Sequence, residues 1–393
     1  MKNMGHQIIG YILNLDGEAA KGVVKGNTTL NSNQCAILQA YIQFCRQLRI
    51  EGIDQGDVDF SVFHGLPQLI QNGRHIFNIW REELGGLTPK LVEIMRLVAE
   101  GELVRVPVFV GFHNVGFDGF DSLNTDCGLL RSYNEGLLEL IPPEARPSTL
   151  SESNHILGFV LESEYPYKVD FNVDGESKNW PPELNQARDH LVNLQENLSL
   201  TFAIAIERTP PVGITPAWTL IIDPLSSGTS ISWNPRTNSP VPFYLCNVDN
   251  QNSIRNWSSM ISNIDDSKIR IAIRRVLSSI NERMNPIDGF IDSVIAWENL
   301  FGGNAELSLR ISAAIARLLK DDEESKHALQ KKIVDFYNER SKIVHGVKEI
   351  THKEAANKRN ECLGIALSCL RALYRTKPEL IPGPERAKKL ILK

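Results

Sequence analysis

Residues 268–284, KIRIAIRRVLSSINERM, decide how the last third of the chain folds. Apolar side chains recur there every three or four residues, at Ile269, Ile273, Val276, Leu277 and Ile280. This spacing places them on one face of a helix, so the segment predicts an amphipathic helix. Asn285-Pro286 follows and ends the helix, because proline cannot continue the backbone hydrogen-bond pattern.

Four further helices are predicted after this one. Apolar residues at helical spacing fall at 287–301, 305–320, 322–345 and 352–375. Gly346 stands where a glycine would cap the third of these helices, which begins with acidic and ends with basic residues, as the helix dipole favours. We therefore expect an all-α helical bundle at 268–376 and a basic tail at 377–393 that is either flexible or docked.

The chain before the bundle has a mixed pattern. Runs rich in Ile, Val, Phe and Thr predict strands at 103–112, 155–161, 199–207 and 217–223. Helical spacing predicts helices at 34–49, 88–100 and 183–196. The two kinds of segment do not alternate strictly, which favours an α+β region at 1–250 over a doubly wound parallel sheet. A loop-rich stretch ends this region, and we expect a linker at 251–267.

The charge of the chain divides at the same place. The whole chain has a formal net charge of −5, which taken alone argues against a nucleic-acid partner. Residues 268–393, however, contain 24 Lys/Arg and 16 Asp/Glu, a net charge of +8, whereas residues 1–267 contain 18 and 31, a net charge of −13. A basic bundle predicts a polyanionic partner such as nucleic acid. Attraction between the two parts of the chain explains the division equally well.

The sequence predicts a cytoplasmic protein without a metal or a cofactor. No secretory signal is visible, and no apolar run approaches the roughly 20 residues needed to cross a membrane. The six cysteines are scattered and form no C-x-x-C pair, so neither a disulfide scaffold nor a zinc site is predicted. Cys362 and Cys369 lie seven residues apart on a predicted helix and are expected to be buried.

The strongest chemical signal is RSKIVHG at 340–346, near the end of the helix predicted at 322–345. An arginine holds phosphate through paired hydrogen bonds, and a histidine titrates near neutral pH and transfers protons. Arg340 and His345 diverge in an ideal helix, but a last turn that tightens or unwinds beside Gly346 would let them converge. Taken alone, such a pair is more typical of a solvated helix end than of a catalytic site.

Three segments in order give this region a family resemblance: FIDSVIAWENLF at 290–301, ELSLRISAAIARLL at 306–319 and DFYNERSKIVHG at 335–346. Residues 268–376 resemble the Apea-like branch of the HEPN superfamily (higher-eukaryote and prokaryote nucleotide-binding domains), and Arg340 and His345 match its R-x4-H signature. The resemblance implies a metal-independent endoribonuclease. It also implies a homodimer in which the R-x4-H helices of two copies form one composite site.

The resemblance implies roles for single residues. Arg340 would stabilise charge on the scissile phosphate, and His345 would transfer a proton to or from the RNA. HEPN nucleases often carry Asn, Asp or His directly after the arginine, where this chain has Ser341, so we place Ser341 with the substrate-binding candidates. Lys342 is either a phosphate contact or an exposed helix lysine.

Other candidates support the site. Glu298 and Arg310 lie within the apolar stripes of their predicted helices, and we favour a buried ion pair that orients the site over two unrelated surface charges. Asn338, just before Arg340, is a further supporting candidate. Tyr337 is expected in the core or an interface rather than as a platform for base stacking.

Two features of the first part are read as structural. GFHNVGFDGF at 111–120 does not match a phosphate-binding loop, and its phenylalanines are expected to form a hydrophobic cluster rather than a recognition surface. VDFNVDGES at 169–177 has acidic residues, Asp170, Asp174 and Glu176, but lacks the rest of a calcium-loop pattern and is expected to be a turn.

Two classes of function follow. The first is a ribonuclease of prokaryotic defence or toxin type, with single-stranded loops of tRNA or mRNA as substrates. Its region 1–250 would sense a trigger ligand or protein, or hold the bundle inactive. The second is a non-catalytic HEPN module that binds RNA, a nucleotide or a protein partner.

Overall fold

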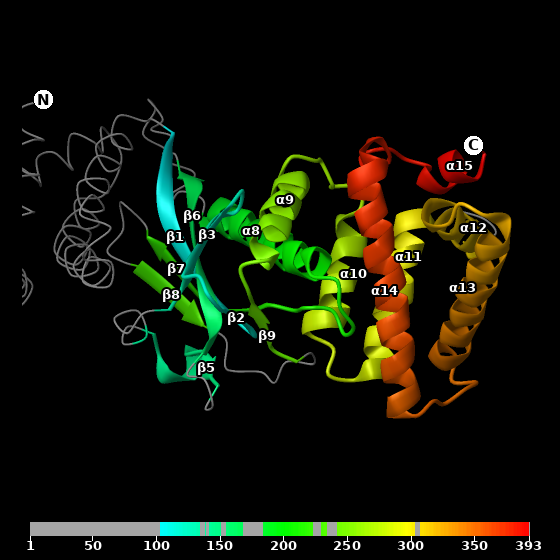
Figure 1. Cartoon of the computed structure of the whole chain (residues 1–393), viewed down its shortest axis with the longest axis horizontal. Helices are drawn as coiled ribbons and strands as arrows, with labels where there is room; N and C mark the ends of the chain where they lie inside the picture. Colours follow the sequence, from blue (N-terminus) through cyan, green and yellow to red (C-terminus); the bar gives the residue numbers. More distant parts are fainter. Residues whose placement is uncertain are drawn as a thin grey trace, which may run out of the picture.

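A computed structural model describes residues 103–133, 138, 141–150, 155–167, 184–222, 229–233, 242–302 and 307–392. An antiparallel sheet region comes first in this part of the chain, and a helical region follows it (Figure 1). The expected order, an α+β part and then a helical part, is thereby confirmed. The helices predicted at 34–49 and 88–100 and the turn predicted at 169–177 lie outside the described residues.

Two long strands, β1 (Val104–His113) and β6 (Ile156–Tyr167), lie at the centre of the sheet. Its other strands are β3 (Ser122–Thr125), β4 (Gly128–Ser132), β5 (Ser148–Thr149), β7 (Thr215–Ile222) and β8 (Thr229–Trp233). The order is β3-β4-β6-β1-β7-β8, all neighbours are antiparallel, and β5 pairs with β6. Separately, β2 (Val115–Phe117) pairs in parallel with β9 (Tyr244–Cys246), and the 3-10 turn η2 (Pro143–Ala145) precedes β5. The strands predicted at 103–112, 155–161 and 217–223 are confirmed as β1, β6 and β7.

The aromatic residues of 111–120 form the hydrophobic cluster that the sequence predicts. Phe112 stacks on Phe159 of β6 with ring centroids 5.1 Å apart, and Phe117 stacks on Phe159 at 5.3 Å. Phe159 in turn stacks on Phe202 at 5.3 Å. The cluster therefore joins the sheet to the next helix along the chain, which carries Phe202.

That helix is α8 (Leu184–Ala205), and it overturns one prediction. Residues 199–207 were expected as a strand, but α8, which the sequence predicts at 183–196, continues through most of them. Leu198 and Phe202 pack in the sheet core, whereas Leu200 and Ile204 pack in the core of the helical region. Because residues 198–204 of α8 are buried on all sides between two cores, the helix has no exposed polar face there, and such a run cannot be told from a buried strand by periodicity.

Helix α9 (Asn250–Ser262) occupies most of residues 251–267, where the sequence predicts a linker. Ile254 is buried in the sheet core, and Trp257 and Ile261 are buried in the helical core. Like α8, α9 lies between the sheet and the remaining helices (Figure 1). Loop composition alone did not reveal it, because its polar, Asn- and Ser-rich sequence resembles the loop before it.

The helical region follows the predicted pattern closely. Its helices are α10 (Arg270–Asn281), α11 (Pro286–Phe301), α12 (Leu307–Leu319), α13 (Glu323–Val344) and α14 (His352–Thr376). Asn285 caps α11 by accepting a hydrogen bond from the backbone N–H of Ile287. Cys362 and Cys369 are fully buried in the core, as predicted.

The chain after Thr376 is docked rather than free. It contains a 3-10 turn, η3 (Pro378–Leu380), and a short helix, α15 (Arg386–Ile391), that contacts α12. Leu380, Ile381 and Ala387 are buried in the helical core. Arg386 is itself buried and donates to the carbonyl of Lys268 at 2.8 Å, which ties the tail to the start of the bundle.

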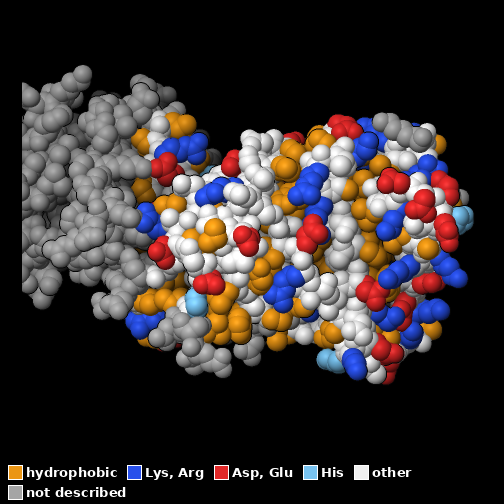
Figure 2. All heavy atoms as spheres, viewed as in Figure 1, with side chains coloured by type: hydrophobic (Ala, Val, Ile, Leu, Met, Phe, Trp, Pro, Cys, Tyr) orange, Lys and Arg blue, Asp and Glu red, His pale blue; other side chains and the backbone are white. Residues whose placement is uncertain are grey.

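Ion pairs connect the oppositely charged parts of the chain. Glu196 of α8 binds Arg274 at 2.7 Å and Arg270 at 3.4 Å, and Glu207 lies 3.6 Å from Arg371 of α14. These contacts support attraction between the acidic and basic parts as one cause of the charge division. On the face shown in Figure 2, basic and acidic side chains are intermixed over the helical end, so the net charge of +8 forms no continuous basic patch on that face.

Candidate functional site

The end of α13 carries the R-x4-H residues and is closed by a glycine cap. Gly346 has φ of +69°, a left-handed conformation that glycine adopts without strain. The backbone N–H of Val347 donates to the carbonyl of Lys342 at 2.8 Å, and that of Gly346 donates to Ile343 at 3.0 Å. This is the Schellman arrangement, and it confirms the predicted cap.

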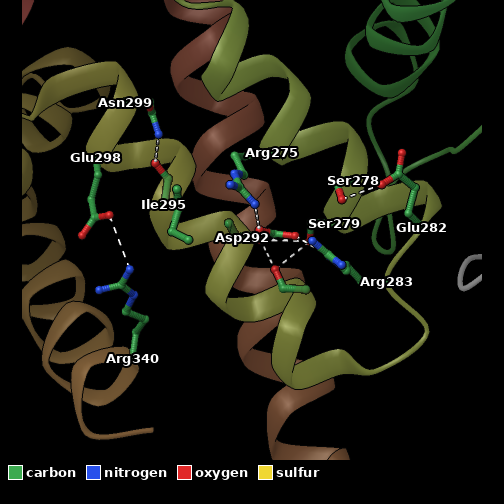
Figure 3. Close-up of polar contacts among 12 residues, drawn as sticks. Arg275, Ser278, Ser279, Glu282, Arg283, Asp292, Ile295, Glu298, Asn299 and Arg340 are labelled. Atoms are coloured by element: carbon green, nitrogen blue, oxygen red, sulfur yellow. Dashed lines mark hydrogen bonds and ion pairs between the residues drawn. The ribbon is translucent and has the colours of Figure 1, made fainter. Parts of the chain in front are cut away.

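Arg340 points from α13 toward α11. Its guanidinium lies 3.6 Å from the carboxylate of Glu298, and both side chains are about one-fifth exposed, at 21% and 23% (Figure 3). Within the described residues, Nε of Arg340 is buried and has no hydrogen-bond partner. The arginine is therefore oriented by one long ion pair and retains hydrogen-bonding capacity.

Tyr337 belongs to the same α11–α13 contact. It packs against the helical core, as predicted for a core or interface residue. Burial, the charge of Glu298 and a hydrogen bond to Glu298 raise the pKa of Tyr337, which keeps its phenol neutral. Glu298 thus has two partners on α13, Tyr337 and Arg340.

His345 lies at the C-cap of α13 with its side chain exposed. The helix stays regular up to this residue, because its N–H donates to the carbonyl of Ser341 at 3.0 Å. The last turn does not unwind to bring the imidazole toward the guanidinium: in the described part of the chain, no hydrogen bond or ion pair joins Arg340 to His345. Around them, Lys342 and Asn338 are exposed and Ser341 is half-buried.

The ion pair expected between Glu298 and Arg310 does not form. Glu298 pairs with Arg340 instead, and Arg310 of α12 makes no ion pair with any described residue. Both arginines lie in helices that follow α11, so the sequence offers two partners for one carboxylate. Helix packing, which decides between them, places α13 beside Glu298.

A second carboxylate next to the site was not identified from the sequence. Glu339 binds Lys348 of the α13–α14 connection through Oε1 and Lys358 of α14 through Oε2. Burial alone would raise the pKa of Glu339, but the hydrogen bonds and charges of the two lysines outweigh it and hold the pKa below its usual range. Its pairing depends on residues 9 and 19 positions away, beyond any helical i,i+4 rule.

A third cluster, also not predicted, joins α10 to α11. The carboxylate of Asp292 is buried and accepts hydrogen bonds from Arg275 at 2.8 Å and Arg283 at 2.6 Å (Figure 3). Nearby, Ser279 and Ser293 both donate to the carbonyl of Gly289. This cluster lies at the α10–α11 contact and involves none of the R-x4-H residues.

In the described segments, no group of three or more His, Cys, Asp and Glu side chains is placed to hold a metal ion. The four described cysteines are free and buried. None of the described helices is both long and apolar enough to cross a membrane.

Compared with known proteins, the chain matches no family model, no curated protein and no solved structure. The chemistry of the site therefore rests on its own residues. They provide a partly buried guanidinium at Arg340, an exposed imidazole at His345 and an exposed amine at Lys342, all near the end of one helix. Such a set suits binding of a phosphodiester and proton transfer at it.

Proposed function

We propose that this protein is a HEPN-type endoribonuclease that cleaves RNA without a metal ion. The observation that carries the proposal is the end of α13. There His345 is exposed at a capped helix terminus, and Arg340 forms an ion pair with Glu298 of α11. The resemblance of residues 268–376 to the HEPN superfamily supplies the reaction class.

The proposed reaction uses the ribose 2′-hydroxyl as nucleophile. The 2′-oxygen attacks the adjacent phosphorus and loses its proton, and the 5′-oxygen of the next nucleotide leaves and gains one. The products are a 2′,3′-cyclic phosphate and a 5′-hydroxyl. His345 transfers the proton at one of these oxygens, and Arg340 stabilises the negative charge that develops on the phosphate. Lys342 contacts a neighbouring phosphate.

A second copy of the chain completes the site in this proposal. Arg340 faces α11 whereas His345 is exposed beyond the end of the helix, and no contact joins them in the described residues of one copy. A homodimer that brings two α13 ends together would place the Arg340 of one copy near the His345 of the other. Exposed Val344 and Val347, which flank His345, supply apolar surface for such a contact.

The substrate proposed is RNA with accessible 2′-hydroxyls, such as the single-stranded loops of tRNA. The biological setting proposed is cytoplasmic antiviral defence or toxin activity in a prokaryote. The region before the bundle would then respond to a trigger ligand or protein.

The test is cleavage of an end-labelled tRNA pool by the full chain with EDTA present. Wild type should produce 2′,3′-cyclic phosphate ends, and Arg340→Ala and His345→Ala should each lose at least about 100-fold in rate, as expected for a phosphate-stabilising or proton-transfer group. Arg317→Ala is the matched control, because Arg317 is an exposed arginine on α12 away from the site. If the variant that combines Arg340→Ala with His345→Ala cleaves like wild type, the catalytic assignment is wrong.

One observation favours the second function, a binding module. Arg340 is already paired with Glu298 and does not contact His345, so the R-x4-H residues of one copy form no assembled site. In that case wild type binds RNA, a nucleotide or a protein but leaves the tRNA pool intact. Weaker RNA binding by Arg340→Ala, without cleavage by any variant, would establish this outcome.

A further inference from the structure

Glu339, the residue immediately before Arg340, fastens three parts of the chain together. Its carboxylate is only 13% exposed. One oxygen binds Lys348, in the connection that follows His345, and the other binds Lys358 of α14 at 2.7 Å. Both oxygens of a mostly buried carboxylate are thus occupied by lysines from different segments.

The ion pair between Glu339 and Lys348 connects α13 to the turn that follows His345. The backbone N–H groups of Val347 and Lys348 both donate to the carbonyl of Lys342, at 2.8 and 3.2 Å, and hold one end of this turn against α13. The ion pair from Glu339 holds the same end through the side chain of Lys348. The imidazole of His345 has no hydrogen bond or ion pair of its own with the described residues, and His345 is the C-cap residue from which this turn leaves α13.

The ion pair between Glu339 and Lys358 lies inside the bundle, away from this turn. Lys358 lies in α14 with its Nζ 5.7 Å from the centre of the Phe336 ring, and Phe336 is buried between α11 and α13. This ion pair therefore ties α13 to α14 within the bundle. The carboxylate of Glu339 thus makes one ion pair with the turn after His345 and another that contributes to helix packing. Mutating Lys348 or Lys358 removes one of these ion pairs and leaves the other.

We infer that Glu339 is a positioning residue for His345 and that it acts through Lys348. The inference rests on the proposed function, because a position for His345 matters to a rate only if His345 transfers a proton. It assigns the ion pair with Lys358 no part in that positioning.

The experiment uses the full chain, four single variants and one double variant. The single variants are Glu339→Gln, Lys348→Met, Lys348→Arg and Lys358→Met. Single-turnover cleavage of labelled tRNA at saturating protein measures the chemical step. Lys348→Met should slow it about 10- to 100-fold, the cost of a misplaced reacting group, and Lys348→Arg should restore most of the rate because arginine also pairs with a carboxylate. The double variant of Glu339→Gln and Lys348→Met should be no slower than the slower single variant, since both break one interaction.

Lys358→Met is the matched control. It removes a lysine from the same carboxylate, and we expect a lower melting temperature with a cleavage rate close to that of wild type. If Lys358→Met slows cleavage as much as Lys348→Met, or if Lys348→Met cleaves like wild type, the inference is wrong.

Amide hydrogen exchange of the peptide spanning 340–350 separates this inference from the proposed function. Exchange at residues 346–348 should be faster in Lys348→Met than in wild type and unchanged in Lys358→Met. A wild type that cleaves no RNA refutes the proposed function, yet the faster exchange would still support the hold of Glu339 on the turn. Equal exchange in wild type and Lys348→Met overturns the inference whatever the activity.

Discussion

Helix α11 carries two carboxylates that bind arginine, one facing α10 and one facing α13, and their surroundings differ. Asp292, at the α10 side, is 4% exposed and accepts hydrogen bonds from two arginines at 2.8 and 2.6 Å. Glu298, at the α13 side, is 23% exposed and lies 3.6 Å from one arginine, Arg340. The same pair of ionic groups thus forms a tight buried contact on the side facing α10 and a loose, partly exposed one on the side facing α13.

The difference separates a contact that holds the fold from one that leaves a cation available. Both oxygens of Asp292 are used, and the carboxylate would be costly to leave unpaired in its buried position. Glu298 orients Arg340 but leaves its buried Nε without a partner among the described residues. The side chain of Arg340 is about one-fifth exposed, so a phosphate that reaches its exposed part competes with one long ion pair, whereas at Asp292 it would compete with two short ones.

The largest expected effect is at Asp292. Asp292→Asn should lower the free energy of unfolding by about 3 kcal/mol, near the low end for breaking a buried pair, because the two arginines are partly exposed and regain water. Denaturant unfolding measures this loss. Asp288→Asn, an exposed aspartate in the first turn of the same helix, is the control and should cost less than about 1 kcal/mol. Equal losses in the two variants would show that the buried ion pairs of Asp292 contribute no more to stability than an exposed aspartate of the same helix.

The next effect tests how tightly the α10–α11 end is packed. A Cβ on Gly289 would lie 2.7 Å from Cδ of Arg359, a buried arginine that donates to the carbonyl of Ile280. Gly289→Ala should therefore destabilise by about 1–2 kcal/mol, the cost of overpacking less the gain in helix propensity.

Gly364 of α14 provides the matched control for this substitution. It is exposed, and a Cβ there meets nothing within 4 Å. Gly364→Ala should stabilise by up to about 1 kcal/mol through helix propensity alone. A stabilising Gly289→Ala would show that Arg359 moves aside and that this end is looser than its contacts imply.

Much of the helical region follows from local pattern. Amphipathic spacing, Asn285-Pro286 and Gly346 give the bounds of the helices to within a few residues, because each signal acts over one or two turns. The same logic failed at α8, where two cores bury opposite sides of one helix and remove the periodicity on which the prediction rests.

The candidate site divides in the same way. The place of Arg340 and His345 at one helix end is a local property and was predicted. The ion pairs of the site depend on which helices pack together. This holds for Arg340 with Glu298, for Glu339 with its two lysines and for Asp292 with its two arginines. The paired residues are too far apart in the sequence for helical spacing to predict them. The packing of α8 also limits how the chain can be shortened. Leu200 and Ile204 of α8 are buried in the helical core, so a truncation that tests whether the first region holds the bundle inactive must keep α8.

The smallest stability effect is expected at Glu298, and it completes the comparison with Asp292. Glu298→Gln should change the free energy of unfolding by less than about 1 kcal/mol, as for other partly exposed ion pairs at this distance. Cleavage should nevertheless slow about 10-fold under the proposed function, because Arg340 loses the charge that orients it. The control is Glu361→Gln, which breaks an exposed pair with Lys332 and should affect neither quantity appreciably. Asp292→Asn should show the reverse pattern, a large loss of stability with an unchanged rate per folded molecule. A common pattern in the two variants would show that both carboxylates of α11 serve the fold alone.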